Sequence, residues 1–201
     1  MSQSQLPSGN AQLSARKDPL RLAELRRLLI LDSTAERVYD DMTLLLSNSL
    51  DVPIAMINML DDERDWLKSS VGLPNRQMSA DKSFCNLFFS SSVDLVVIED
   101  ATQDARLATH PFVVGAPHVR FYAAVRLKVG GHTVGTLCVR DQKPRRISTE
   151  QILQMQTLAN AVVDLLSERA GSSAVSLEFM ARLGTVHENG VARSRPAGRV
   201  A

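Results

Sequence analysis

Apolar residues recur along this chain at two spacings, one typical of helices and one typical of strands. Leucines three or four residues apart over 19–29 predict a helix, and a similar stripe over 38–46 predicts a second. Asp18 followed by Pro19 favours a helix N-terminus, because aspartate can cap the helix and the missing proline N–H costs nothing there. A long helix is predicted from about 149 to 169, with an apolar stripe formed by Ile152, Met155, Leu158, Val162, Leu165 and Leu166.

Strand-like runs fill the region between these helices. Residues 52–60 are nearly all apolar, as expected for a central strand covered on both faces. Residues 65–72 and 94–100 predict two further strands. Between those two, residues 81–90 predict a short helix, and residues 101–118 show no regular pattern.

A hairpin is predicted around the glycine pair at 130–131, because a two-residue turn of this kind needs positive φ. If residues are paired outward from this turn, Leu127 lies opposite Val134 and Ala123 lies opposite Cys138. This register gathers on one face Phe121, Ala123, Val125, Leu127, Val134, Thr136, Cys138 and Arg140, and on the other face Tyr122, Ala124, Arg126, Gly135, Leu137 and Val139. Neither face is plainly polar, so we expect both to be covered.

Composition places the 201-residue chain among globular proteins with one domain, since 44% of its residues are hydrophobic and 22% are charged. The net charge of +1 and the 4% of aromatic residues give no indication of a nucleic-acid partner. No segment approaches the roughly 20 apolar residues of a membrane span, and the N-terminus lacks the apolar core of a secretory signal. We therefore expect a cytoplasmic protein that contacts neither membrane nor nucleic acid.

Three regions are expected along the chain. Residues 1–18 predict a disordered arm, residues 19–170 the folded domain, and residues 171–201 a mostly disordered, arginine-rich tail. The two cysteines, Cys85 and Cys138, are too few for a disulfide framework or a four-cysteine zinc site.

Several segments together resemble the GAF domain family over roughly residues 20–170. They are ILDSTAE (30–36), VPIAMINMLDDERDWLKSSVGL (52–73), SFC (83–85), VIEDATQDARL (97–107), HPFVVGAPHVRFYAA (110–124) and GTLCVRDQKPR (135–145). The resemblance implies an α+β fold, with an antiparallel sheet that carries the N- and C-terminal helices on one face and a small-molecule pocket on the other. It also implies a sensing and dimerisation module, whose relatives bind cyclic nucleotides, bilins, haem or small metabolites.

Two arginines depart from the usual pattern of similar domains. Arg126 stands where they usually have proline, and Arg140 where they usually have isoleucine or leucine. Arg126 could anchor an anionic ligand through its planar fork of donors, or it could extend from a strand end to water. For Arg140 the simpler expectation is a salt bridge to Asp141 or Asp100.

The two cysteines have a structural and a chemical interpretation. Cys85 lies in the first turns of a short helix, which can favour a thiolate. Free cysteines are nevertheless most often buried packing residues, which is the interpretation we favour for Cys85 and Cys138. The resemblance implies bilin attachment at a Cys-His pair, which this chain lacks, and no histidine is placed as an obvious haem ligand. The cofactor is therefore unknown.

Other candidate residues lie near the expected pocket. Asp100 can cap the turn that follows its strand, and Arg106 can tie down the irregular segment, so that both shape the pocket wall. The full set of candidate ligand-binding residues is Trp66, Cys85, Asp100, Arg106, Tyr122, Arg126 and Cys138.

The sequence leaves three functions open. The leading hypothesis is a non-catalytic sensor that binds a small, anionic molecule and acts on a signalling partner in trans. It could form a homodimer through its first and last helices, since Met155, Leu158, Val162 and Leu165 have coiled-coil spacing. The alternatives are a free methionine-R-sulfoxide reductase or thiol redox sensor that uses Cys85 and Cys138, and a dimerisation module with a collapsed pocket.

Overall fold

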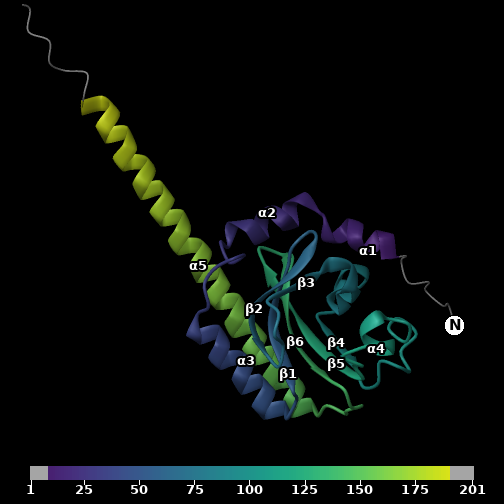
Figure 1. Ribbon diagram of the computed structural model, residues 1–201. Coiled ribbons are helices and arrows are strands. Elements are labelled where there is room, and N and C mark those ends of the chain that lie inside the picture. Colours follow the sequence, from purple (N-terminus) through teal and green to yellow (C-terminus); the bar gives the residue numbers. More distant parts are fainter. Residues whose placement is uncertain (1–8, 191–201) are drawn as a thin grey trace, which may run out of the picture.

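A computed structural model describes the backbone of residues 9–190 and the side chains of residues 12–172. Six strands form one antiparallel sheet in the order β3-β2-β1-β6-β5-β4, flanked by helices (Figure 1). This arrangement confirms the predicted α+β class. The strands are β1 (Ile54–Leu60), β2 (Arg64–Val71), β3 (Gln77–Ser79), β4 (Leu95–Ile98), β5 (Phe121–Val129) and β6 (His132–Asp141). The α-helices are α1 (Gly9–Arg16), α2 (Pro19–Arg27), α3 (Arg37–Leu50), α4 (Pro111–Val114) and α5 (Thr149–Gly190), with 3-10 turns η1 (Ala80–Lys82) and η2 (Phe84–Ser90).

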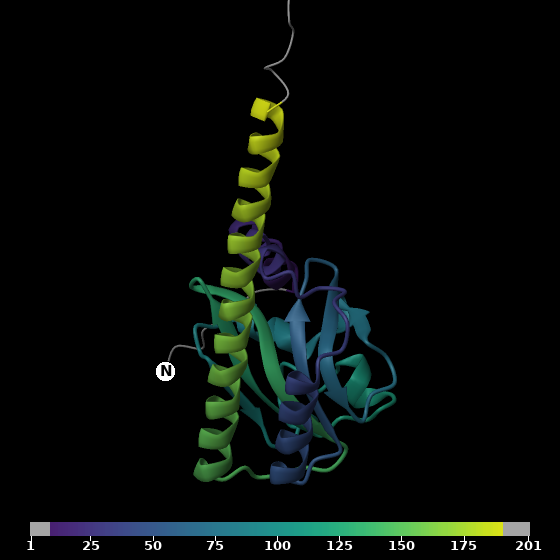
Figure 2. The same cartoon turned by 90° about the vertical axis from the view of Figure 1, so that its left-hand side faces the viewer.

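Helices α3 and α5 cover one face of the sheet and lie side by side across it (Figure 2). They bury the apolar residues that the helical spacing predicted, among them Leu46, Met155 and Val162, against alternate residues of the central strands. Burial of this apolar surface is the main stabilising contribution of the layer. The capping of α2 by Asp18 is confirmed, because its carboxylate accepts a hydrogen bond from the Arg21 amide at 2.8 Å.

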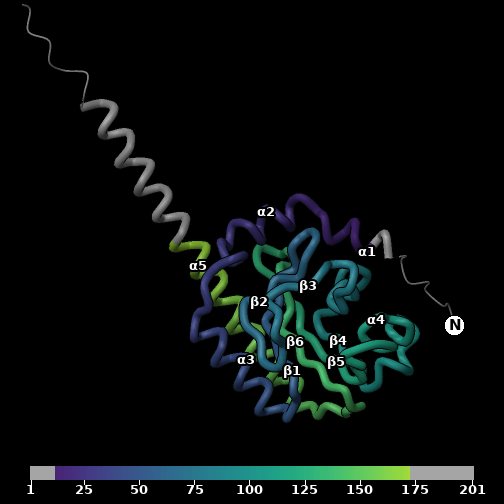
Figure 3. The backbone as a smooth tube through the Cα atoms, in the orientation of Figure 1, coloured from purple at the N-terminus to yellow at the C-terminus, as the bar shows by residue number. Residues whose placement is uncertain are grey.

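The opposite face of the sheet is covered by short and irregular segments. The turn η2 and the segment that contains α4 lie on the side away from α3 and α5 (Figures 1 and 3). Their apolar side chains form a second core with the other faces of β1, β5 and β6; it includes Phe84, Leu87, Phe88, Leu107, Val113 and Val119. The short helix predicted over residues 81–90 is in fact two 3-10 turns.

The register of the central hairpin differs from the prediction by one residue. Val129 does pair with His132, but the register shifts between Leu127 and Lys128, so that Leu127 pairs with Gly135. A shift of one residue moves every following side chain to the opposite face, because side chains alternate along a strand. The shift places Thr136, Cys138 and Arg140 on the face of Tyr122, where the sequence had predicted separate faces.

Next to this register shift, the close packing of β6 against β1 requires glycine at position 135. A Cβ atom on Gly135 would lie 2.5 Å from the carbonyl oxygen of Asn58 on the adjacent strand β1. Only a residue without a side chain allows such a close approach of two backbones.

Both ends of the domain contain more helix than the sequence predicted. Within the segment expected to be a disordered arm, residues 9–16 form α1, whose last residue, Arg16, is completely buried. At the other end α5 continues to Gly190, where a tail from residue 171 was expected. The remaining parts of both predictions, residues 1–8 and 191–201, lie outside the described residues.

Candidate functional site

The candidate site is a cluster of buried polar side chains on the sheet face opposite α3 and α5. Strand β5 contributes Tyr122, β6 contributes Cys138 and Arg140, and the turn η2 contributes Cys85. All four side chains are almost fully excluded from solvent. Burial of so many polar groups is costly unless each finds a partner, so their hydrogen bonds decide what the site can do.

Cys85 is the centre of this cluster. Its sulfur lies 3.2 Å from the Thr136 hydroxyl, 3.4 Å from the Tyr122 hydroxyl and 3.5 Å from the Asn58 amide nitrogen. The Thr136 hydroxyl also contacts the Cys138 sulfur at 3.9 Å. The fold therefore brings together three of the predicted candidates, Cys85, Tyr122 and Cys138.

The pKa values of the two thiols are shifted in opposite directions. A hydrogen bond from Cys138 lowers the pKa of Cys85 to about 6 despite its burial, and the positive charge of Arg140 acts in the same direction. The same contact with Cys85, together with burial, raises the pKa of Cys138 well above its usual value. Within this pair, one proton leaves readily and the second is held. Of the two thiols, Cys85 is therefore the one that favours the thiolate form.

Arg140 has no carboxylate partner among the residues whose side chains are described, contrary to the expected salt bridge. Asp141 pairs with Arg145, and Asp100 pairs with Arg120. The Arg140 side chain is 2% exposed and lies over the rings of Phe84 and Tyr122, at 4.9 and 5.8 Å from their centroids. Its Nε and Nη2 atoms are buried and find no hydrogen-bond partner among the described residues.

Arg126 lies at the edge of the same face, and its donors are in use. It donates to the backbone oxygens of Ser91 and Val93 at 2.7 Å each and to the Thr133 hydroxyl at 3.0 Å. It also forms an ion pair with Asp94 at 3.2 Å. These contacts hold the chain before β4 against β5, and they leave few donors for an anionic ligand.

The remaining predicted candidates lie away from the cluster. Trp66 packs in the apolar core beneath the helices, on the other face of the sheet. Asp100 accepts hydrogen bonds from Thr102 and from Arg120, which hold its pKa far below the usual range. Arg106 forms a two-point ion pair with Asp104. Asp100 and Arg106 thus fix the segment between β4 and β5 and touch none of the cluster residues in the described contacts.

A buried ionic network, which the sequence analysis did not predict, extends from the cluster to α1. Arg16 forms an ion pair with Asp65 at 2.6 Å, and the Asp65 carboxylate also accepts from Asn58 at 2.7 Å and from Ser83 at 2.5 Å. Asn58 in turn contacts Cys85. Helix α1 is therefore connected to the thiol cluster through charged and hydrogen-bonded side chains. Arg16 lies in the segment that was predicted to be disordered from its composition. Only recognition of the helix that ends at Arg16 could have indicated its role.

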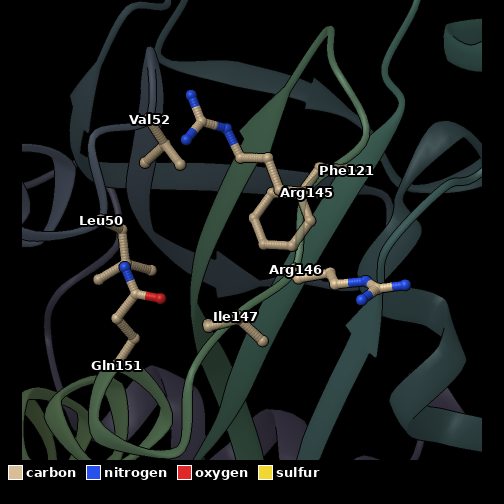
Figure 4. A pocket seen from close by; sticks show the side chains of 7 residues that line it. All are labelled: Leu50, Val52, Phe121, Arg145, Arg146, Ile147 and Gln151. Atoms are coloured by element: carbon tan, nitrogen blue, oxygen red, sulfur yellow. The ribbon is translucent and has the colours of Figure 1, made fainter.

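A separate small hollow of about 40 Å³ lies at the end of the sheet near the start of α5. In Figure 4, Arg145 and Arg146 border it, but their guanidinium groups point in different directions. Arg145 is paired with Asp141. The hollow is lined by Leu50, Val52, Phe121, Arg145, Arg146, Ile147 and Gln151. It therefore offers no convergent set of free donors.

Searches of the described part of the chain found neither a metal-binding arrangement nor a membrane span. No group of three or more His, Cys, Asp or Glu side chains there could hold a metal ion. None of the helices in those residues is both long and apolar enough to cross a bilayer.

Comparisons with known proteins agree with the fold. The family model described as GAF domain matches residues 34–166. A Pseudomonas aeruginosa protein named cyclic di-GMP phosphodiesterase is 34% identical over 136 residues, which make up 67% of this chain. Those residues are 23% of the relative, so this chain spans less than a quarter of that protein's length.

Solved structures give the same result. The GAF domain of an Acinetobacter phosphoenolpyruvate-protein phosphotransferase has a TM-score of 0.55 and 21% identity, covering 79% of this chain and 96% of that one. A type II free methionine-R-sulfoxide reductase of Thermoplasma acidophilum has a TM-score of 0.51 and 15% identity, covering 68% and 92%. At these identities the similarity shows a shared fold and not a shared activity.

Proposed function

The chain belongs to the GAF domain family, and we propose that it is a non-catalytic sensor that binds a small molecule beside Cys85, Tyr122 and Arg140. The observation that carries this proposal is the buried polar cluster on the sheet face opposite α3 and α5. A purely structural face would be apolar or have its polar groups fully paired. Here a buried guanidinium has two nitrogen atoms that find no acceptor in the described part of the chain.

The proposed signal passes to a partner in trans, through the helices. The network from Cys85 through Asn58 and Asp65 to Arg16 gives a physical route by which changes at the cluster affect the docking of α1. Such a route transmits a signal only if its elements have two arrangements that the ligand distinguishes. A ligand that changes the hydrogen bonding of Cys85 meets this requirement.

Homodimerisation is part of the same proposal. All four residues of the predicted α5 seam pack against this chain's own core: Met155 and Val162 are buried there, and Leu158 and Leu165 are partly buried. The apolar residues left for a second copy lie on the outer surfaces of the adjacent helices α3 and α5. They include Leu44, Leu45 and Leu153, which are exposed by 49%, 50% and 58%. A second copy that covers these residues would remove their apolar surface from water.

Native mass spectrometry of the protein purified from its host tests the sensor proposal. We expect a mass increase from a retained small molecule, together with a dimer. A protein with no bound molecule, which remains monomeric at micromolar concentration, would contradict the proposal and favour a module with a collapsed pocket. The same spectrum reports the mass of a bound molecule and the number of protein copies. Ligand binding and dimerisation are therefore tested independently of each other.

An enzymatic alternative follows from the contact between the two thiols. A free methionine-R-sulfoxide reductase needs a thiolate that reaches its substrate and a second thiol that resolves the oxidised intermediate. Cys85 and Cys138 are close enough to share the Thr136 hydroxyl, but both sulfurs are completely buried. Turnover of free methionine-R-sulfoxide by the wild-type protein, lost in Cys85→Ser, would establish this alternative. No turnover by the wild type rules it out.

The phosphodiesterase name of the Pseudomonas relative is not carried over as an activity. The aligned residues make up 23% of that protein, so its name does not assign an activity to this domain. What this match supports is the proposed role of the domain as a regulatory module.

A further inference from the structure

The buried Arg140 fork is the strongest indication of a ligand in this molecule. The donors on its Nε and Nη2 atoms lie along one edge of the planar guanidinium, and both atoms are excluded from solvent without a partner among the described residues. An isolated buried cation is among the most costly groups in a protein interior. The aromatic rings of Phe84 and Tyr122 beneath it compensate only part of this cost.

Two other arginines show what this fork binds. Arg120 uses its Nε and Nη2 atoms to hold both oxygens of Asp100, at 2.7 and 2.6 Å. Arg106 holds Asp104 in the same way, at 2.9 and 2.6 Å. Both pairs are two-point contacts with the oxygens of a carboxylate, the geometry to which a guanidinium is best matched. In Arg140 the same two atoms have no acceptor within the described side chains and backbone.

His110 adds a further free donor, on a ring that also contacts Phe84. Its Nδ1 atom accepts a hydrogen bond from the Phe112 amide at 3.1 Å, which places the proton of the neutral ring on Nε2. Nε2 is buried and has no partner among the described residues. The ring of Phe84 joins the two donors, because it contacts His110 at 4.4 Å between centroids and underlies the Arg140 guanidinium.

Both groups with free donors therefore contact one aromatic ring, that of Phe84. Arg140 and His110 offer three N–H donors and no acceptor, and the rings of Phe84 and Tyr122, which meet edge to face at 5.3 Å, form an apolar wall beside them. The two carboxylates that were expected to pair with Arg140 do not reach it, since Asp100 and Asp141 are bound to Arg120 and Arg145.

We propose that Arg140 and His110 form the anchor for the oxyanion of a small ligand, such as a carboxylate or phosphate group, whose apolar part packs against Phe84 and Tyr122. Two oxygens of the ligand accept from Nε and Nη2 of Arg140, and one accepts from Nε2 of His110. This inference rests on the proposed sensing function and identifies its ligand class. It also transfers the role of anion anchor from Arg126, whose donors are engaged by Ser91 and Val93, to Arg140.

Nuclear magnetic resonance of the full ¹⁵N-labelled chain tests this anchor through the arginine Nε–H resonances. Sodium acetate and sodium phosphate are titrated in separate samples at constant ionic strength, with sodium chloride as the reference salt. We expect one Nε–H resonance, assigned to Arg140 by its absence in Arg140→Leu, to shift saturably with at least one of the two oxyanions. The acetate and phosphate arms then tell a carboxylate from a phosphate ligand.

Variants separate the two arginines. Arg140→Leu is expected to bind the probe at least about tenfold more weakly, because a buried charge-assisted pair is lost. Arg126→Leu, the matched control on the same face, is expected to bind as the wild type does. If Arg140→Leu does not fold, Arg140→Lys, which keeps the charge but loses the fork, is expected to show the weakened binding.

Several outcomes would overturn the inference. They are the absence of any shift with either oxyanion, equal binding by wild type and the Arg140 variants, or loss of binding in Arg126→Leu alone. A shift of the Arg140 resonance that follows the titration of Cys85, and no added anion, would identify the thiolate as its partner and would also overturn it. A neutral molecule retained in native mass spectrometry would sink the oxyanion anchor while leaving the sensor proposal intact.

Discussion

Arg16 and Asp65 form an ion pair at 2.6 Å in which both side chains are completely excluded from solvent. The pair joins the last residue of α1 to strand β2, 49 positions later in the chain. Arg16 also donates to the Asp61 and Arg64 backbone oxygens and to the Asn86 side chain. A single arginine thus holds helix α1 against the domain, because its side chain donates hydrogen bonds to several buried oxygen atoms.

Removal of one member of this pair should be strongly destabilising. Asp65→Asn leaves the Arg16 charge buried without a counter-charge, and we expect a loss of about 3–5 kcal/mol in the free energy of unfolding. Urea denaturation followed by circular dichroism measures the change. Arg27→Met, which removes the solvent-exposed partner of Glu24, is the control and should cost at most about 1 kcal/mol. Equal effects of the two substitutions would show that the buried pair is not needed to anchor α1.

The close approach of two strands at Gly135 gives a second prediction. Gly135→Ala places a Cβ atom 2.5 Å from the Asn58 carbonyl oxygen, so β1 and β6 must separate. We expect a loss of about 1–3 kcal/mol in the free energy of unfolding, typical of overpacking. Gly171→Ala is the matched control, because no atom lies within 4 Å of its added Cβ and it stands within α5. In a helix this change should stabilise by about 0.5–1 kcal/mol. Thermal unfolding of both variants decides whether the register shift depends on Gly135.

The elements of this fold could be predicted because they follow local periodicity. Helical spacing located α2, α3 and the first half of α5, and the glycine pair located the turn between β5 and β6. What periodicity could not give was the one-residue shift at Leu127, since it depends on how β1 packs against Gly135. That shift decides which residues form the site, because it brings Cys138 and Arg140 to the face of Tyr122.

The composition of the site was predicted only in part, for the same reason. Cys85, Tyr122 and Cys138 were candidates, and the structure brings them together. Arg140 was expected to pair with Asp141 or Asp100, an expectation that nearness in sequence alone suggested. Arg145 and Arg120 bind those aspartates instead, from 4 and 20 positions away in the chain. Only the three-dimensional packing shows which arginine is left without an acceptor among the described residues.

The acidity of Cys85 gives a prediction for the thiol pair. Ultraviolet absorbance of the native protein should show one thiolate forming with a pKa of about 6, while Cys138 remains protonated far above its ordinary range. Cys138→Ala removes the hydrogen bond that is the largest cause of this acidity, so the pKa of Cys85 should rise. Cys85→Ala should abolish the low-pH thiolate signal altogether. A native protein without any thiolate at pH 8 would contradict the predicted contact.

The lowered pKa of Cys85 also determines how its contribution to the free energy of unfolding depends on pH. A group whose pKa is lowered by folding stabilises the folded state above the unfolded value, here 9.0, and loses this contribution as the pH falls toward 6. The free energy of unfolding contributed by Cys85 should therefore increase from pH 6 to pH 9. The difference in unfolding free energy between the wild type and Cys85→Ala, measured at several pH values, isolates it. A difference that stays constant over this window would count against the thiolate.

His110 provides the last prediction, which concerns Arg140 directly. Burial, followed by the positive charge of Arg140, lowers the pKa of His110 from 6.5 to about 4. Because the folded value is the lower one for a base, this group destabilises the fold as the pH falls from 6.5 toward 4, and has no effect above that window. Proton resonances of the His110 ring measure its pKa. In Arg140→Leu the repulsive charge is gone and the pKa should rise, although burial keeps it below 6.5. In Arg126→Leu it should not change. An unchanged His110 pKa in Arg140→Leu would show that the two donors do not share one site.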